Sequence, residues 1–118
     1  MKKILVAEDN DSNFILMSYI LKKFYQFERA KNGQEAVEMA DKGQYDIVLM
    51  DIKMPIMNGL EATKAIKEKH PDLPVVALTA NAFDSDRQLA VEAGCDDFLP
   101  KPVSSEACIE TIKRFVGE

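Results

Sequence analysis

The stretch IVLMDIKMP, residues 47 to 55, places a single aspartate at the end of an apolar run. Ile47 to Met50 are four apolar residues in succession, which is typical of a strand buried on both faces of a parallel sheet. Asp51 follows directly, and aspartate is almost never fully buried unless it is paired. The stretch therefore predicts a carboxylate at the tip of a buried strand, where something must keep it ionised.

Apolar runs of strand length alternate with segments of helical period along the rest of the chain. Strands are predicted at residues 4–7, 27–30, 47–50, 75–78 and 98–99. Helices are predicted at residues 12–24, 34–42, 59–69, 85–93 and 106–116. This (βα)5 alternation predicts an α/β fold of three layers, a doubly wound sandwich with one parallel sheet between two layers of helices.

The composition of the strands predicts their order in the sheet. The first, third and fourth strands are continuous apolar runs, as expected for central strands. The second and fifth strands carry or adjoin charged residues and a proline, which suits the edges of a sheet. Right-handed crossovers then give the flavodoxin-like order 2-1-3-4-5. The ligand crevice of such a sheet lies at the carboxyl ends of strands 1 and 3.

Polar side chains gather at that predicted crevice. Glu8 and Asp9 follow the first strand, and Asp51 follows the third. Three converging carboxylates repel one another, and Mg²⁺, which prefers carboxylates, carbonyls and water, relieves that repulsion. Thr79 ends the fourth strand and Lys101 follows the fifth. Each residue alone fits a helix cap, a solvated loop or a surface lysine, but together they predict phosphoryl transfer to a carboxylate.

Composition bounds the class of protein. The chain has 118 residues, of which 47% are hydrophobic and 30% charged, and we expect one domain spanning residues 1–118. A net charge of −5 argues against a nucleic-acid surface. The sequence carries no signal-peptide pattern and no apolar stretch of transmembrane length, so we expect a cytoplasmic protein with no membrane partner. Cys95 and Cys108 lack metal or redox spacing and are expected to be buried, reduced thiols.

These motifs together resemble the receiver domains of two-component response regulators, and the resemblance covers essentially the whole chain. The residues that carry it are Glu8-Asp9-Asn10, Asp51 within DIKMP, Asn58-Gly59, Thr79-Ala80 and Lys101-Pro102. The resemblance implies that Asp51 is the phosphoacceptor. It also implies that Glu8, Asp9 and Asp51, with the backbone carbonyl of Lys53, hold Mg²⁺.

The resemblance assigns roles at the last two strand ends as well. Thr79, Ala80 and Lys101 would bind the phosphoryl group, and Phe98 matches the family's aromatic switch position. The Lys101–Pro102 peptide bond is expected to be cis, which costs little before proline. Phosphorylation would then change the surface of the fourth helix, fifth strand and fifth helix, a two-state switch. Pro100 departs from the family, which usually has a small residue before this lysine.

The resemblance also implies partners. The motifs are most similar to receivers of hybrid sensor kinases or to single-domain response regulators. The donor would be a sensor histidine kinase or a histidine phosphotransfer protein, and the output a downstream effector protein, with the chain a monomer or a weak phosphorylation-dependent dimer. The chain would promote only its own phosphorylation and dephosphorylation and would not be an enzyme acting on other substrates.

The first helix predicts a docking surface. Its helical period places an apolar stripe against the sheet, formed by Leu16, Met17, Ile20, Leu21 and Phe24. Ile15 and Tyr19 are left on the solvent side, beside the acidic crevice. Scattered surface apolar residues are normal, but these two, with Val103 at their edge, would suit a partner that presents a phosphohistidine to Asp51.

The residues alone also allow other functions. The receiver could be a relay intermediate that passes its phosphoryl group on, or a binding module that takes none. A haloacid-dehalogenase-like phosphatase also forms an aspartyl phosphate, but Lys53 stands where that family has a second acid. A flavin or nucleotide carrier of this fold needs a Gly- or Ser/Thr-rich loop after the first strand, whereas EDNDSN repels phosphate unless a metal is bound.

Overall fold

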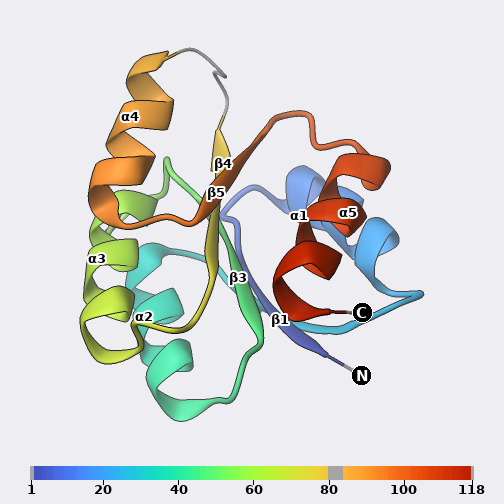
Figure 1. Cartoon of the computed structure of the whole chain (residues 1–118), viewed down its shortest axis with the longest axis horizontal. Coiled ribbons are helices and arrows are strands. Elements are labelled where there is room, and N and C mark those ends of the chain that lie inside the picture. The colour runs from blue at the N-terminus through green and yellow to red at the C-terminus, as the bar shows by residue number, and fades with distance from the viewer. Residues whose placement is uncertain (1, 80–83, 118) are drawn as a thin grey trace.

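A computed structural model of the chain describes residues 2–79 and 84–117. Within these residues strands and helices alternate, as predicted (Figure 1). The strands are β1 (Lys3–Ala7), β2 (Gln26–Ala30), β3 (Ile47–Asp51), β4 (Val75–Thr79) and β5 (Asp97–Pro100). The helices are α1 (Asp11–Leu21), α2 (Gly33–Lys42), α3 (Gly59–Lys69), α4 (Asp84–Ala93) and α5 (Ser105–Val116).

The strands form one parallel sheet in the order β2-β1-β3-β4-β5, which confirms the predicted flavodoxin-like topology. Figure 1 shows the sheet between two layers, with α1 and α5 on one face and α2, α3 and α4 on the other. The central strands β1, β3 and β4 are covered on both sides. Their apolar residues are therefore fully buried, whereas β2 and β5 have partly exposed positions.

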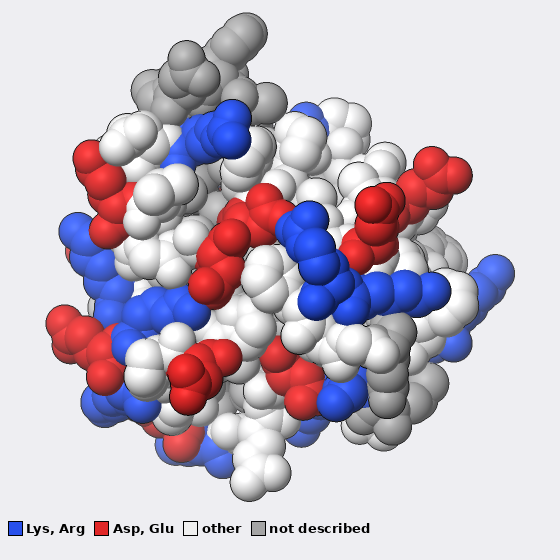
Figure 2. Space-filling model, in the orientation of Figure 1, with Lys and Arg blue, Asp and Glu red and all other residues white. Residues whose placement is uncertain are grey.

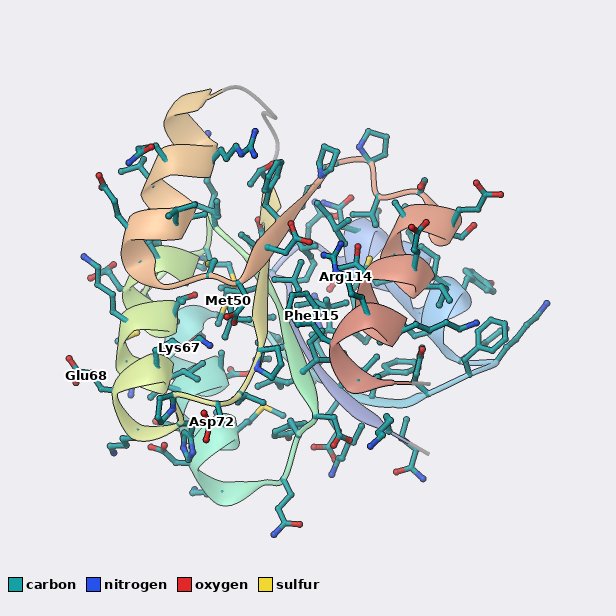
Figure 3. The ribbon with its side chains drawn as sticks, viewed as in Figure 1. Met50, Lys67, Glu68, Asp72, Arg114 and Phe115 are labelled. Atoms are coloured by element: carbon teal, nitrogen blue, oxygen red, sulfur yellow. The ribbon has the colours of Figure 1, made fainter. Side chains whose placement is uncertain are left out.

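Alternate residues of each central strand supply two separate cores. Val6 and Leu49 pack with Leu21 on the side of α1 and α5. Val48 and Met50 pack on the side of α2 and α3, and Met50 is labelled in Figure 3. Burial of a large aliphatic side chain contributes about 1.5 to 3 kcal/mol. The rigid frame that these cores create holds the carboxyl ends of β1, β3 and β4 at fixed positions.

Helix α1 is shorter than predicted, and two of its apolar residues do not face the sheet. It ends at Leu21, whose carbonyl accepts the N–H groups of Phe24 and Tyr25. This turn puts Tyr25 into the core, while Phe24 is 52% exposed. Leu16 is 42% exposed because it borders a groove between α1 and α5. The prediction that Leu16 and Phe24 face the sheet is therefore wrong.

The surface and the cysteines carry less information about function. On the face shown in Figure 2, basic and acidic side chains lie interspersed. Among the residues that the structure describes, no helix has the length and apolar character needed to cross a membrane. Both cysteines are free thiols. Cys108 is buried, and burial raises the pKa of its thiol to about 12, but Cys95 is only half-buried, contrary to expectation.

Candidate functional site

The pairing of β1 with β3 brings the predicted acids together. Ala7 lies opposite Met50 in the parallel register, so Glu8 and Asp51 follow at the same level. Glu8 is 1% exposed and Asp51 is 5% exposed, while Asp9 is exposed to solvent. One carboxylate oxygen from each of the three lies within 4.8 Å of the others. Two of these acids are therefore buried where a carboxylate needs a positive partner.

Lys101 supplies positive charge at this cluster. Its Nζ lies 3.0 Å from Glu8 Oε2 and 3.1 Å from Asp51 Oδ1. Its backbone N–H donates to the carbonyl of Thr79 at 2.7 Å, which ties it to the end of β4. The Lys101–Pro102 peptide bond is cis. Burial alone would lower the pKa of Lys101, but the contacts with the two carboxylates raise it above its ordinary value.

One lysine shared between two buried acids does not fully compensate them. Burial, and then the negative charge of Glu8, raise the pKa of Asp51 to about 6, although Lys101 acts in the opposite direction. A raised pKa means that the surroundings disfavour the ionised carboxylate. A second cation in the crevice would therefore lower the free energy of the folded protein and keep Asp51 ionised.

The oxygen atoms that line the crevice suit a divalent cation. Oxygens coordinated octahedrally to Mg²⁺ lie about 3 to 4 Å from one another, so a small contraction of the acidic cluster brings its three oxygens into range. The crevice is a hollow of about 200 Å³, and Asn10, Asn13 and Lys53 also line it. The donor set of hard oxygens fits a divalent cation held by Glu8, Asp9 and Asp51.

The turn after β3 is held against Asp51 by a glycine. A Cβ on Gly59 would lie 2.0 Å from the carbonyl oxygen of Asp51, so any larger residue would push α3 away from β3. The N–H of Gly59 donates to the carbonyl of Ile52 at 2.8 Å. Asn58 and Glu61 form the predicted capping box at the start of α3. The backbone that follows Asp51 is thus anchored.

Thr79 and Phe98 lie at the ends of neighbouring strands. Thr79 is 1% exposed, and its hydroxyl oxygen has no hydrogen-bond partner among the described residues. An unpaired buried hydroxyl is unusual and is available to a ligand. Phe98 is half-buried, and the guanidinium carbon of Arg87 lies 4.9 Å from the centre of its ring. Ala80, also predicted at this site, lies outside the described residues.

The predicted docking residues differ in their exposure. Ile15 is 52% exposed and Tyr19 is 62% exposed, and Lys22 Nζ lies 4.5 Å from the centre of the Tyr19 ring. Val103 is only 8% exposed because it packs into the core beneath α1 and α5. Val103 therefore exposes little apolar area to a partner, and its part in docking stays a prediction.

Two features beside the site escaped the sequence analysis. Arg29, a charged residue of the edge strand β2, donates to the backbone carbonyls of Glu8 and Asp9. Ile56, in the turn after β3, has a φ of +69° and is 83% exposed. A β-branched residue with positive φ is an outlier that local sequence signals do not predict.

The comparisons with known proteins agree with this geometry. Residues 4–113 match the response regulator receiver domain family, and the chain belongs to it. Hybrid signal transduction histidine kinase B of Dictyostelium discoideum is 43% identical over 99% of this chain, which spans 7% of that protein. The polar-differentiation response regulator DivK of Brucella anthropi is 36% identical, and the match covers 99% of this chain and 98% of DivK.

Solved structures share the whole fold. The receiver domain of a sensor histidine kinase from Pseudomonas aeruginosa PAO1 superposes with a TM-score of 0.93 at 32% identity, covering 99% of this chain and 98% of that one. That crystal structure has a magnesium ion coordinated in its active site cleft. The receiver domain of Saccharomyces cerevisiae Ssk1, crystallised with the histidine phosphotransfer protein Ypd1, has a TM-score of 0.93 at 31% identity, over 98% and 89% of the chains.

Proposed function

We propose that this receiver domain is a phosphorylation-dependent switch that accepts a phosphoryl group on Asp51 in a Mg²⁺-dependent reaction. The observation that carries the proposal is the meeting of three carboxylates, with Lys101 in contact with two of them, at the ends of β1 and β3. The magnesium-bound receiver of the Pseudomonas kinase supports the choice of metal. Residues 1–118 would form one receiver domain, either as a whole protein or as part of a longer one.

The residues of the crevice have distinct roles in this reaction. The Asp51 carboxylate attacks phosphorus, the bond from phosphorus to the donor breaks, and the donor leaves with that bond's electron pair. Glu8, Asp9, Asp51 and the backbone carbonyl of Lys53 would hold Mg²⁺, which neutralises charge on the phosphoryl oxygens when bound. Lys101 and the unpaired Thr79 hydroxyl would bind the oxygens of the product.

The added charge would couple the site to the surface. An aspartyl phosphate carries roughly −1.5 to −2 charge, whereas the ionised Asp51 carboxylate carries −1, so negative charge increases beside two further acids. Lys101 and Thr79 would move toward the new oxygens, and Phe98 would then turn into the space that Thr79 leaves. Arg87, which now lies over the Phe98 ring, would lose that contact. The side chains on the surface of α4, β5 and α5 would thereby repack, and a downstream effector would bind the changed surface.

Incubation with acetyl phosphate and Mg²⁺, followed by intact mass measurement, tests this proposal. The wild-type chain should gain one phosphoryl group, and chelation of the metal should prevent the gain. Asp51→Asn should gain none, because the amide cannot act as the nucleophile. Labelling of Asp51→Asn on an aspartyl residue, or no labelling of the wild type, would show the assignment to be wrong.

The exposed side of α1 is the proposed docking surface for the donor, a sensor histidine kinase or histidine phosphotransfer protein. Ile15 and Tyr19 provide exposed apolar area beside the crevice, and the structure of the Ssk1 receiver with Ypd1 supports a partner of this kind. The chain would receive the phosphoryl group from such a donor. It would then act as a terminal switch, or pass the phosphoryl group on as a relay intermediate.

A comparison of donors tests this docking surface. Ile15→Ala should slow phosphotransfer from a histidine phosphotransfer protein and leave labelling by acetyl phosphate unchanged, because small donors need no docking. Val91→Ala is the matched control, since Val91 is an exposed apolar residue on α4. Equal effects of Ile15→Ala on both donors, or none on either, would exclude the surface.

A further inference from the structure

Arg29 lies beside the loop between β1 and α1 that carries Glu8 and Asp9. Its Nε donates to the backbone carbonyl of Glu8 at 3.0 Å, and its Nη2 donates to the carbonyl of Asp9 at 3.3 Å. The same Nη2 lies 2.9 Å from Asp11 Oδ1. The guanidinium carbon also lies 4.7 Å from the centre of the Phe14 ring. One side chain, 17% exposed, therefore contacts the loop and the first turns of α1.

These contacts constrain the backbone of the loop and do not involve the Glu8 and Asp9 carboxylates. Arg29 binds the carbonyl oxygens, while the carboxylate oxygens gather with Asp51 in the crevice. The loop is also held by the N–H of Glu8, which donates to the carbonyl of Ala30 at 3.0 Å. Two successive carbonyls bound to one planar fork have little freedom to rotate.

We propose that Arg29 is a positioning residue that holds Glu8 and Asp9 in the arrangement that binds a divalent cation. The inference rests on the proposed function, because it takes the acidic cluster to be the Mg²⁺ site. Arg29 does not touch the reacting atoms, and it acts through the backbone of the loop. Groups that orient metal ligands typically change metal affinity by about 10- to 100-fold when they are removed.

Two physical effects of Arg29 on Mg²⁺ have opposite signs, so they can be separated. A guanidinium near the crevice repels a metal ion, and its removal by charge alone would strengthen binding. Its hydrogen bonds order the ligands, and their loss would weaken binding. We expect the second effect to prevail, because Asp11 already compensates the charge of Arg29, whereas the two carbonyl contacts need its fork.

The test measures the Mg²⁺ dissociation constant by calorimetry and amide hydrogen exchange in the loop, with Mg²⁺ as the only ligand. Arg29→Ala and Arg29→Lys are compared with the wild type, since lysine keeps the charge and loses the fork. Arg114→Ala is the matched control (Figure 3). Arg114 pairs with Asp97, and its guanidinium carbon lies 5.2 Å from the centre of the Phe115 ring. Arg114→Ala therefore removes an ion pair and a ring contact far from the crevice.

We expect both Arg29 variants to bind Mg²⁺ about 10-fold more weakly and to exchange the amides of residues 8–11 faster, with Arg114→Ala unchanged in both. Should Arg29→Ala not fold, Arg29→Lys decides the question alone. Tighter or unchanged Mg²⁺ binding in the folded variants would overturn the inference while leaving the proposed function intact. A wild-type chain that binds no Mg²⁺ and takes no phosphoryl group would overturn both.

Discussion

Acidic side chains at the two ends of the sheet differ in how well their charge is compensated. At the amino end, Asp96 accepts hydrogen bonds from Lys67 Nζ at 2.7 Å and from the N–H of Val75 at 2.9 Å. Its side chain is 35% exposed, so water reaches it as well. At the carboxyl end, Asp51 is 5% exposed and shares Lys101 with Glu8. One acid is satisfied within the fold, whereas the other is short of positive partners.

This difference separates an acid that supports the structure from one that is available for chemistry. A carboxylate that accepts a backbone N–H and a full ammonium gains stability from its charge. The charge of a buried carboxylate that shares one lysine with another acid destabilises the folded protein. The pKa of Asp51 is accordingly raised to about 6. The carboxyl end of the sheet should therefore bind a cation favourably.

The largest expected contrast comes from neutralising one acid at each end. The pKa of Asp51 is raised from 3.8 to about 6, so the folded protein becomes more stable as pH falls through that range and less stable when Asp51 is ionised. Without metal at pH 7.5 (about 1.5 units above that pKa of about 6), Asp51→Asn should therefore raise the free energy of unfolding by about 1 to 3 kcal/mol. Asp96→Asn should lower it by about 1 to 2 kcal/mol, because hydrogen bonds to charge are lost. Urea unfolding measures both, and changes of the same sign would remove the contrast.

Removal of the lysine at each end gives the next largest effect. Lys101→Ala should lower the free energy of unfolding of the metal-free protein by about 2 kcal/mol, because it leaves Glu8 and Asp51 uncompensated. Lys67→Ala should cost less than about 1 kcal/mol, since Asp96 keeps the Val75 N–H and water. Added Mg²⁺ should restore stability to Lys101→Ala more than to Lys67→Ala. Equal stabilisation of both variants by Mg²⁺ would contradict the comparison.

Metal affinity should depend on pH through Asp51. Below its pKa of about 6, a proton on Asp51 competes with Mg²⁺, so the apparent dissociation constant should rise by up to about tenfold for each unit of pH. Above that pKa the ionised carboxylate binds metal, and the constant should level off. Calorimetry from pH 5 to 8 (roughly the range around that pKa) measures the profile. A profile that is as steep in Asp51→Asn as in the wild type would assign the dependence to another group.

The smallest effect concerns backbone strain beside the crevice. Ile56 has a φ of +69°, where a β-branched residue is strained, whereas asparagine adopts this region more readily. Ile56→Asn should therefore raise the free energy of unfolding by about 0.5 to 1 kcal/mol. Val91→Asn, at an exposed position in α4, removes a similar apolar surface without relieving strain and should give no gain. Thermal unfolding compares the two, and an equal change in both would show that strain contributes nothing.

Sequence periodicity determined the sheet order and the three acids at its crevice. Strand length, charge at the edges and the handedness of crossovers are properties of short segments and their connections, so they place Glu8, Asp9 and Asp51 at neighbouring strand ends without knowledge of side-chain contacts. Thr79 and Lys101 follow from the same reasoning. The residues of the candidate site were therefore predictable wherever their positions depend on the backbone topology alone.

Tertiary contacts decided which side chains are covered and which are held. Periodicity places Phe24 on the inner stripe of α1, but the helix ends early and Tyr25 takes the core position, while Val103 turns inward beneath α1 and α5. Arg29 on β2 binds the carbonyls of Glu8 and Asp9 in the loop after β1, and no local sequence pattern indicates these contacts. Burial and hydrogen bonding depend on neighbours distant in the chain, whereas a sequence pattern reports only on the segment that contains it.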